Sequence, residues 1–332
     1  MNLNKETWPT FYFNPVSARL LFSALALLVF LLPPPVQAFE VLLGTGEHGS
    51  FSNFAGRALC RTISRHVPEV TCSTRTANDE IDNLTNLQSG SLDFAIINSN
   101  TLDDAVNKRR IFQFLDINYE NLAILMPLYD RPIGLIARND SGISTLGDLK
   151  GKRINSGPPG STENRAMRLI MSAKGWSEDD FSLFEELPSS HSQGTMAFCH
   201  GTIQAMLTIG VHPALATQRV LENCNAHLVS ISDDSIDKLV ASRPPCWKSE
   251  IQAQSYPGHG EAVETFGTRA ILVASNTVDQ ETANAIVKAI YDNRKRLQNS
   301  HPALSLYPVQ EAGKGIKGLK LHEGAVRFFT SQ

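Results

Sequence analysis

A glycine-rich loop near the start of the chain has the residue types and spacing of an anion-binding site. An apolar, strand-like run over residues 40–43 breaks at the sequence GTGEHG, residues 44–49, and a helix-like pattern follows. These letters match the G-x-G-x-x-G fingerprint, in which backbone N–H groups at a helix start hold the pyrophosphate of a dinucleotide. Because a single match of this kind is weak, the compartment of the protein decides whether a dinucleotide is a plausible ligand.

Residues 1–38 are typical of a cleaved secretory signal peptide. Lys5 and Arg19 precede an apolar run over residues 20–32, and Val36-Gln37-Ala38 supplies the small residues that a signal peptidase requires. The run is shorter than the roughly 20 residues that cross a bilayer, and the alternative is an uncleaved N-terminal anchor. We expect a mature chain that begins near Phe39 and lies in the periplasm.

Export argues against the dinucleotide. An exported protein meets no pool of nicotinamide cofactor in its compartment. In addition, the second predicted strand ends in Arg75-Thr76, where a dinucleotide site needs an acidic residue for the ribose. The loop and helix start still fit a small anion or carboxylate. We therefore expect no cofactor, and ligand contacts from Gly46, Gly49, Ser50 and Phe51.

Composition is that of a globular protein with no sign of a nucleic-acid partner. The chain has 19% charged and 42% hydrophobic residues and a net charge of −3. It contains no C-x-x-C, and its nine histidines show neither H-x-H nor H-x-x-x-H spacing, so we expect no metal site. The length after the signal peptide fits two domains at ~100–200 residues each.

Five cysteines in an exported chain predict disulfides. Cys60 and Cys72 lie on a predicted helix and the strand after it, and Cys199 and Cys224 flank a helix and a turn. The economical pairing is Cys60–Cys72 and Cys199–Cys224, each stabilising by roughly 3 kcal/mol in the chain-entropy model. That pairing leaves Cys246 free.

A second glycine loop occurs halfway along the chain. A predicted strand over residues 152–155 leads through a glycine-proline loop at residues 157–160 into a helix that begins near Ser161. Ser161 or Thr162 can cap that helix. Two such loops predict one cleft, although each could be an ordinary strand-to-helix turn. The ligand-binding residues expected from this loop are Gly157, Ser161, Thr162, Asn164 and Arg165.

The remaining pattern alternates strands and helices and predicts an α/β fold with mostly parallel sheets. The predicted segments are a helix over residues 80–90, a strand over 92–100, an extended run over 120–139 broken at Pro132, a helix and strand over 193–210, a strand over 264–275 and a helix over 278–298. Ligands of such sheets bind at the carboxyl ends of the strands, where both loops would lie.

Several motifs taken together resemble a known family. They include G-T-G-x-x-G-S-F at residues 44–51, G-P-P-G-S at 157–161, C-H-G-T-I-Q-A-M at 199–206 and L-H-E-G-A-V-R-F-F at 321–329. This order resembles the TAXI-type solute receptors of TRAP transporters, which hand a small solute to a sodium-coupled membrane permease. The resemblance covers Leu42 to Phe329 and includes the paired cysteine positions.

The resemblance implies an α/β, two-lobed periplasmic-binding-protein fold of the second type, with the ligand cleft between the lobes. The implied parts are residues 39–128 and 264–332 for the first lobe and 129–263 for the second, with chain crossings near residues 129–136 and 262–270. It also implies a monomer without catalytic activity, a small carboxylate or amino acid as solute and a TRAP permease as partner.

The chain departs from the family pattern at three places near the implied cleft. Asp79-Glu80 precedes Asn83 where the family usually has Gly-Ser, and Asn98-Ser99-Asn100 stands where it usually has Gln-Ser-Asp. Arg165 lies one position later than the family arginine, which turns a helical side chain by about 100°. The resemblance thus adds Glu80, Asn83, Asn98, Ser99 and Asn100 to the expected ligand-binding residues.

The added acid leads to a hypothesis about the solute. If Asp79 or Glu80 faces the cleft, it repels a dianion and favours a solute with an amino group next to its carboxylate. In the alternative, both acids point to solvent and the solute is an ordinary dicarboxylate.

Two other functions and a few single residues remain open. Ser235-Ile236-Asp237-Lys238 matches the S-x-x-K of some exported hydrolases but lacks their S-D-N and K-T-G partners. A ligand-binding component of a signalling system is a second alternative. We interpret His212 and His322 as structural hydrogen-bonding residues and Arg138, Arg153 and Arg269 as surface or inter-lobe ion pairs, while Tyr256 and Phe266 either line the cleft or pack.

Overall fold

The computed structural model describes residues 38–119, 121–188, 193–243, 245–275, 277–306 and 318–331. Apart from Ala38, the predicted signal peptide lies outside these ranges. The chain divides into two units, Met1–Ala38 and Phe39–Gln332, and only the second is described below. Within the described ranges, no helix is both long and apolar enough to cross a membrane.

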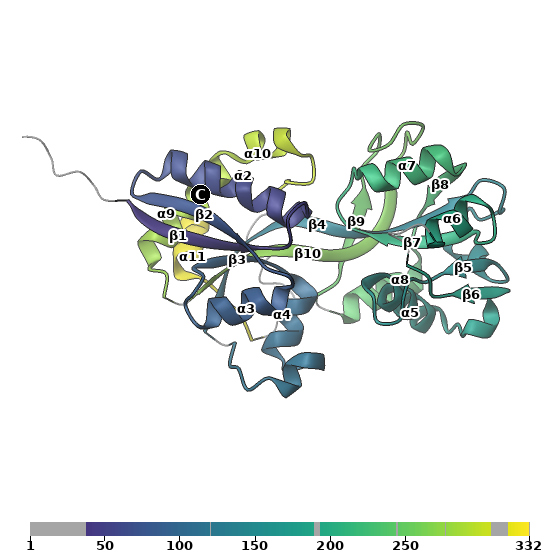
Figure 1. Ribbon diagram of the computed structural model, residues 1–332, viewed down its shortest axis with the longest axis horizontal. Coiled ribbons are helices and arrows are strands. Elements are labelled where there is room, and N and C mark those ends of the chain that lie inside the picture. The colour runs from purple at the N-terminus through teal and green to yellow at the C-terminus, as the bar shows by residue number, and fades with distance from the viewer. Residues whose placement is uncertain are drawn as a thin grey trace, which may run out of the picture. The chain divides into compact units, whose positions relative to one another are not determined.

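The first group of strands is parallel and carries a helix after each strand (Figure 1). β1 (Phe39–Thr45) lies between β2 (Val70–Thr76) and β3 (Phe94–Asn98). The helices that follow these strands are α2 (Phe51–His66), α3 (Glu80–Gln88) and α4 (Ser99–Val106). Every residue of β3 is buried, as expected for a parallel strand covered on both faces.

Two long antiparallel neighbours, β4 (Leu122–Arg138) and β10 (Val263–Ser275), connect this group to a second group of strands. β10 pairs with β3 and with β9 (Trp247–Ile251), whereas the second half of β4 pairs with β7 (Ala205–Ile209) and β8 (Ala226–Val229). At the crossing, a β-carbon on Gly267 would lie 2.3 Å from the carbonyl oxygen of Arg131, so only glycine fits there.

β4 runs unbroken through Pro132, where the sequence predicted a break. Pro132 is the last β4 residue paired with β10, and Ile133 is the first paired with β7. The N–H that proline lacks therefore falls where the strand changes partners, and little of the ladder is lost.

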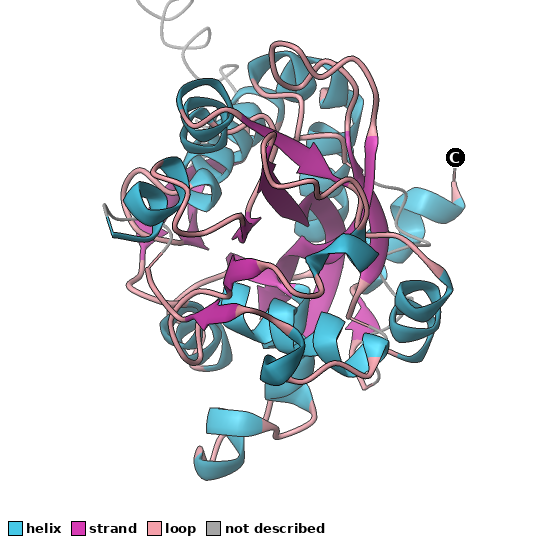
Figure 2. Cartoon of the chain, turned by 90° about the vertical axis from the view of Figure 1, so that its right-hand side faces the viewer, coloured by secondary structure: helices cyan, strands magenta, loops and turns pink. Residues whose placement is uncertain are grey.

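The second group contains the parallel strands β5 (Arg153–Asn155), β6 (Leu183–Glu185) and β7. Its helices are α5 (Thr162–Lys174), α6 (Gln193–Cys199), α7 (Leu215–Asn223) and α8 (Asp234–Ser242). The chain ends in α9 (Gln280–Asp292), α10 (Arg294–Ser300), β11 (Lys320–Leu321) and α11 (Glu323–Thr330), and short 3-10 turns include η1 (Arg110–Phe114). Helices surround the strands (Figure 2).

The predicted helix over residues 278–298 is two helices in the structure. α9 ends at Asp292, and the amide of Asn293 donates to the carbonyl oxygen of Ala289 at 2.8 Å. Asparagine side chains that bond to the backbone in this way compete with helix continuation, which explains the interruption.

Both predicted cysteine pairs are joined in the structure. Cys60–Cys72 ties α2 to β2, and Cys199–Cys224 ties the end of α6 to the end of α7. Cys246 is free and buried. Each bridge lies beside a hydrophobic core, so disulfide and core stabilise the same elements.

Candidate functional site

Three helices begin where the parallel strands β1, β3 and β5 end, and each start is capped by a side chain. Ser50 accepts the backbone N–H of Asn53 at α2, Asn98 accepts that of Asn100 at α4, and Ser161 accepts that of Asn164 at α5. Caps of this kind satisfy N–H groups that a helix start otherwise leaves free. The glycine loops therefore lead into helices as predicted, with part of their N–H groups already bonded.

The first glycine of the first loop serves packing. A β-carbon on Gly44 would lie 2.5 Å from Oδ1 of Asn83, a buried residue of α3. Nδ2 of Asn83 donates to the carbonyl oxygen of Thr45 at 3.1 Å, and Oδ1 has no hydrogen-bond partner among the described residues. The predicted ligand residue Asn83 thus lies against β1, inside the first group of strands.

Two of the other predicted residues of this loop, Gly46 and Phe51, contact other parts of the protein. The N–H of Gly46 donates to Oγ of Ser52 at 3.3 Å, and Gly49 has a φ of 84°, which favours glycine. The ring of Phe51 packs edge-on against Tyr129 and His301, with centroids 4.8 and 4.6 Å apart. Phe51 therefore extends the hydrophobic core at the start of α2.

Glu80 supports the start of α4. Its Oε1 accepts the backbone N–H of Asn98 at 3.0 Å, and the hydroxyl of Thr101 donates to its Oε2. Asp79 is exposed and caps α3 by accepting the N–H of Asp82 at 2.9 Å. Both carboxylates thus hold helix starts, and Glu80 is the one that is half-buried.

The predicted residues at the start of α4 join the crossing strands to the second group. Nδ2 of Asn98 donates to Oγ1 of Thr268 at 2.8 Å. The buried hydroxyl of Ser99 donates to the carbonyl oxygen of Pro245 at 3.1 Å and accepts the N–H of Arg269 at 3.1 Å. Asn98 and Ser99 therefore contact both β10 and the segment before β9.

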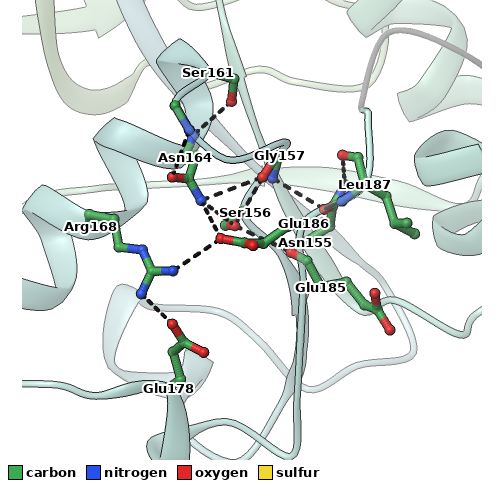
Figure 3. A network of polar contacts seen from close by, with 11 residues as sticks. Asn155, Ser156, Gly157, Ser161, Asn164, Arg168, Glu178, Glu185, Glu186 and Leu187 are labelled. Atoms are coloured by element: carbon green, nitrogen blue, oxygen red, sulfur yellow. Dashed lines mark hydrogen bonds and ion pairs between the residues drawn. The ribbon is translucent and has the colours of Figure 1, made fainter.

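Asn164 lies at the centre of the polar network at the start of α5 (Figure 3). Its Nδ2 donates to Oγ of Ser156 at 2.9 Å and to Oε1 of Glu186 at 3.0 Å, and Arg168 donates to the same Oε1 at 3.0 Å. The N–H of Gly157 donates to Oδ1 of Asn155 at 3.2 Å. Asn164 is buried, and its amide joins the glycine loop to Glu186, the residue that follows β6.

Arg165 is held by its own loop. Its guanidinium donates to the carbonyl oxygen of Gly160 and, at 3.3 Å, to the hydroxyl of Thr162. Burial lowers the pKa of Arg165, and the nearby Arg110 lowers it further. The start of α5 therefore faces η1, which lies beyond the end of α4.

A cavity of about 740 Å³ lies along the crossing of β4 and β10. Its walls come from β4, β9 and β10, the start of α8, the loop after β7 and residues 302–305. Its charged residues are Asp130, Asp233, Asp234, Asp237, Lys248, Glu250, Glu264 and Arg269. None of the predicted ligand-binding residues lines it, but Ser99 bonds to its wall residue Arg269, and Phe51 contacts His301 next to Pro302.

The buried wall of the cavity carries an ion pair of Arg269, which the sequence predicted as a surface or inter-lobe pair. Arg269 is only 5% exposed, and its Nε donates to Oδ1 of Asp130 at 2.7 Å. Ser249 donates to Oδ2 of Asp130 at 3.1 Å, and the guanidinium lies 5.1 Å from the ring centre of Trp247. Charged residues inside two long apolar strands were the available signal for this site, because burying a charge requires a partner.

Two residues left open by the sequence, Phe266 and Tyr256, and the predicted hydrogen-bonding residue His212 now have positions. Phe266 lines the cavity and is buried. Tyr256 packs in the core around α7, and its hydroxyl bonds to Nδ1 of His212, which also lines the cavity. Burial lowers the pKa of His212 to about 4, so its imidazole is neutral at pH 7. The described residues contain no cluster of His, Cys, Asp and Glu that could hold a metal ion.

Solved structures of solute-binding proteins share this architecture. A TctC solute-binding protein from Polaromonas aligns with a TM-score of 0.56 at 13% identity, covering 82% of this chain and 90% of that chain. The periplasmic sulfonate-binding protein SsuA from Methylobacillus flagellatus aligns with a TM-score of 0.50 at 12% identity, covering 87% and 81%. The probable amino-acid transporter extracellular-binding protein ytmK from Bacillus subtilis aligns with a TM-score of 0.50 at 13% identity, covering 81% and 98%.

These alignments confirm the predicted fold class, a mixed α/β periplasmic-binding-protein fold of the second type. At such low identity they bear on the fold alone. A family model described as the NMT1-like family matches residues 43–332. Since that match spans nearly all of the described residues, the chain belongs to the NMT1-like family.

Proposed function

We propose that this protein is an extracytoplasmic solute-binding receptor that delivers a small carboxylate or amino-acid-like solute to a TRAP-type membrane permease. The observation that carries the proposal is the cavity at the crossing of β4 and β10, whose walls come from these two strands, β9, the start of α8, the loop after β7 and residues 302–305. Membership of the NMT1-like family and the motifs that resemble TAXI receptors support it. Closure of the two predicted lobes around the solute would exclude water and stabilise the bound state.

The proposed domains are those implied by the resemblance, with β4 and β10 as the crossings between lobes. Both strands contribute to the cavity through Asp130, Pro132, Phe266 and Arg269. The shape of a cavity on the crossing strands depends on the angle between the lobes, because these strands bend when the lobes close. This relation links solute binding to a shape that a permease can recognise.

A thermal-shift screen of the mature protein, residues 39–332, tests the receptor function. The panel contains dicarboxylates, amino acids, amines and keto acids, and a ligand of the native state raises stability by RT ln(1 + [L]/Kd). We expect one carboxylate or amino-acid class to stabilise the protein in a saturable way. Stabilisation by NADH or NADPH instead of these classes would contradict the proposal.

The nature of the solute is tested at Glu80. Glu80 does not line the cavity, but it holds the start of α4, where Ser99 bonds to the wall residue Arg269. We propose that its charge favours a solute with an amino group, and the alternative is a plain dicarboxylate. Glu80→Ser restores the usual family residue, and Glu80→Gln keeps the side-chain size while removing the charge. Loss of amino-acid binding or gain of dicarboxylate binding in both variants supports the hypothesis. An unchanged ligand profile, with exposed Asp79→Ser as the control, contradicts it.

The partner and the compartment complete the proposal. We place the protein in the periplasm, where both disulfides can persist. Solute uptake into vesicles that contain the candidate permease should require the receptor and a sodium gradient. Binding to a sensor kinase without any transport would favour the signalling alternative.

The S-x-x-K motif behind the hydrolase alternative has a structural role at the start of α8. Asp233 caps α8, and the hydroxyl of Ser235 donates to that cap residue. Lys238 is exposed. The S-x-x-K match is therefore the first turn of a capped helix, which supports a receptor without catalysis.

A further inference from the structure

The helix α4 ends with a lysine at a position where glycine is usual. The N–H of Lys108 donates to the carbonyl oxygen of Ala105 at 3.2 Å, and the N–H of Arg109 donates to that of Asp104 at 2.8 Å. These two bonds form the Schellman motif, in which the first residue beyond the helix cap adopts a left-handed backbone and is most often glycine. Lys108 takes that position with a φ of 49°.

A second basic residue in this segment also has a left-handed backbone. Arg110, the first residue of η1, has a φ of 57°. Residues with a β-carbon are strained in this conformation, and strained residues cluster at functional sites. Lys108 is exposed and the side chain of Arg110 is 53% exposed, so burial of these side chains does not offset the strain. Their positions therefore indicate a role at the surface.

Two large apolar side chains of η1 are exposed beside these cations. Phe114 is 77% exposed and Ile111 is 50% exposed. Residues three apart lie on the same side of a 3-10 helix, so these two side chains share one face. Phe112, on the other side, is buried and packs edge-on against Tyr119, with ring centroids 5.7 Å apart. The buried ring thus anchors η1 and leaves its apolar face in solvent.

The charges of this segment are arranged with the cations outward. Arg109 pairs with Asp103 at 2.6 Å, and Nε of Arg110 lies 3.8 Å from Oδ2 of Asp104. The two arginine side chains are 54% and 53% exposed, whereas the two aspartate side chains are 6% and 22% exposed. Asp116, which follows η1, is an exposed acid. With the lysine before the two arginines, the outer surface carries more positive than negative charge.

We propose that this surface, residues 108–114, rests on a lipid bilayer with anionic headgroups. Ile111 and Phe114 enter the headgroup region, and the three cations contact lipid phosphates. Exposed apolar side chains next to basic ones are the combination that binds anionic bilayer surfaces. A fluid headgroup layer accommodates two protruding side chains without a shaped pocket, and the contact is weak and reversible because only two side chains insert. The inference does not depend on the identity of the solute.

Co-sedimentation of the mature protein with vesicles tests the contact. Vesicles with equal parts of phosphatidylglycerol and phosphatidylcholine should bind the protein, and vesicles of phosphatidylcholine alone should bind it several-fold less. Raising the salt concentration from about 0.05 to 0.5 M should weaken binding, because salt screens exposed charges. The emission of Phe114→Trp should shift to the blue on binding and be quenched by brominated lipid. Met196→Trp, at an exposed site on α6, should show neither change.

Variants separate lipid binding from folding. Lys108→Gln removes the charge, and Lys108→Gly removes both the charge and the backbone strain. Both should bind anionic vesicles about fivefold less, which is the contribution of one cation at such a surface. Lys108→Gly should unfold at the same or a higher urea concentration than the wild type, so its weaker binding would not reflect unfolding. Ile111→Ser/Phe114→Ser should lose most of the binding, while Met196→Ser and the exposed Lys238→Gln should bind as the wild type does.

Several outcomes would overturn the inference. They are equal binding to the two kinds of vesicle, binding that does not respond to salt, and unchanged binding in the Lys108 variants or in the double serine variant. If the protein binds phosphatidylcholine vesicles that contain a permease through these residues, but not anionic vesicles, the surface serves a protein partner and the lipid contact fails. A stabilising solute in the thermal-shift panel without vesicle binding leaves the receptor function standing and refutes only the lipid contact.

Discussion

Nε of Arg269 lies 2.7 Å from Oδ1 of Asp130, and this pair joins the two strands that cross between the groups. Its side chains are 6% and 14% exposed. A buried pair of this kind adds little net stability over apolar residues, but loss of one partner leaves an uncompensated charge. The pair therefore constrains substitutions at the cavity wall more than it stabilises the fold.

Arg269→Met should lower the free energy of unfolding by about 3 kcal/mol, because Asp130 loses its cation in a buried site. The double variant Arg269→Met/Asp130→Leu should recover much of that loss. Urea unfolding of the mature protein measures both, and Lys288→Met, from the exposed pair with Asp292, serves as the control. Additive effects of the two substitutions would contradict the coupling.

Gly44→Ala should destabilise the protein by about 2 kcal/mol. The added β-carbon would meet Asn83 and Leu92 at 2.5 and 2.6 Å, inside the first group of strands. Gly210→Ala is the control, since a β-carbon there would meet no atom within 4 Å. Equal unfolding free energies for the two variants would show that Gly44 is not required for packing.

The state of the cysteines can be measured directly. Non-reducing digestion and mass spectrometry should find Cys60–Cys72 and Cys199–Cys224, and Cys60→Ser/Cys72→Ser should cost about 3 kcal/mol. Burial raises the pKa of the Cys246 thiol to about 11, so the native protein should resist thiol reagents at pH 8 and react only in urea. Rapid labelling of Cys246 in the native protein would refute its burial.

Asp233 should make stability depend on pH. Burial opposes its ionisation, but the ammonium of Lys174, the hydroxyl of Ser235 and the N–H of Ile236 together lower its pKa to about 2. A lowered folded-state pKa stabilises above the unfolded value of about 3.9, and this contribution is lost as pH falls from about 4 to 2.

Asp233→Asn should thus cost about 1–2 kcal/mol at pH 7 and much less at pH 2.5, measured by urea unfolding at both values. Asp279→Asn is the matched control, because Asp279 also caps a helix. Hydrogen bonds from Thr282 and Glu281 lower the pKa of Asp279 without help from a cation, so this control should show a smaller cost with the same pH direction. A pH-independent cost at position 233 would contradict the ionic explanation.

Local sequence alone determined the alternation of strands and helices, the helix after each glycine loop and the economical cysteine pairing. A cap joins residues three apart, and strand and helix periods repeat within a few residues, so these features are readable from a short window. The NMT1-like match and the aligned solute-binding proteins bear out the fold class that these features, with the family resemblance, predicted. The lobe boundaries and the ligand-binding residues stay predictions.

Tertiary structure decided where the polar side chains point. Asn83 and Asn164 stay predicted ligand residues, but which protein groups their amides contact, Thr45 of β1 and Glu186 just after β6, follows from the segments that the fold brings to them. The partners at the cavity are equally far apart in sequence, with 139 positions between Arg269 and Asp130 and 44 between His212 and Tyr256. Such pairs form because the strands cross in the folded chain, and no local sequence pattern predicts where strands cross.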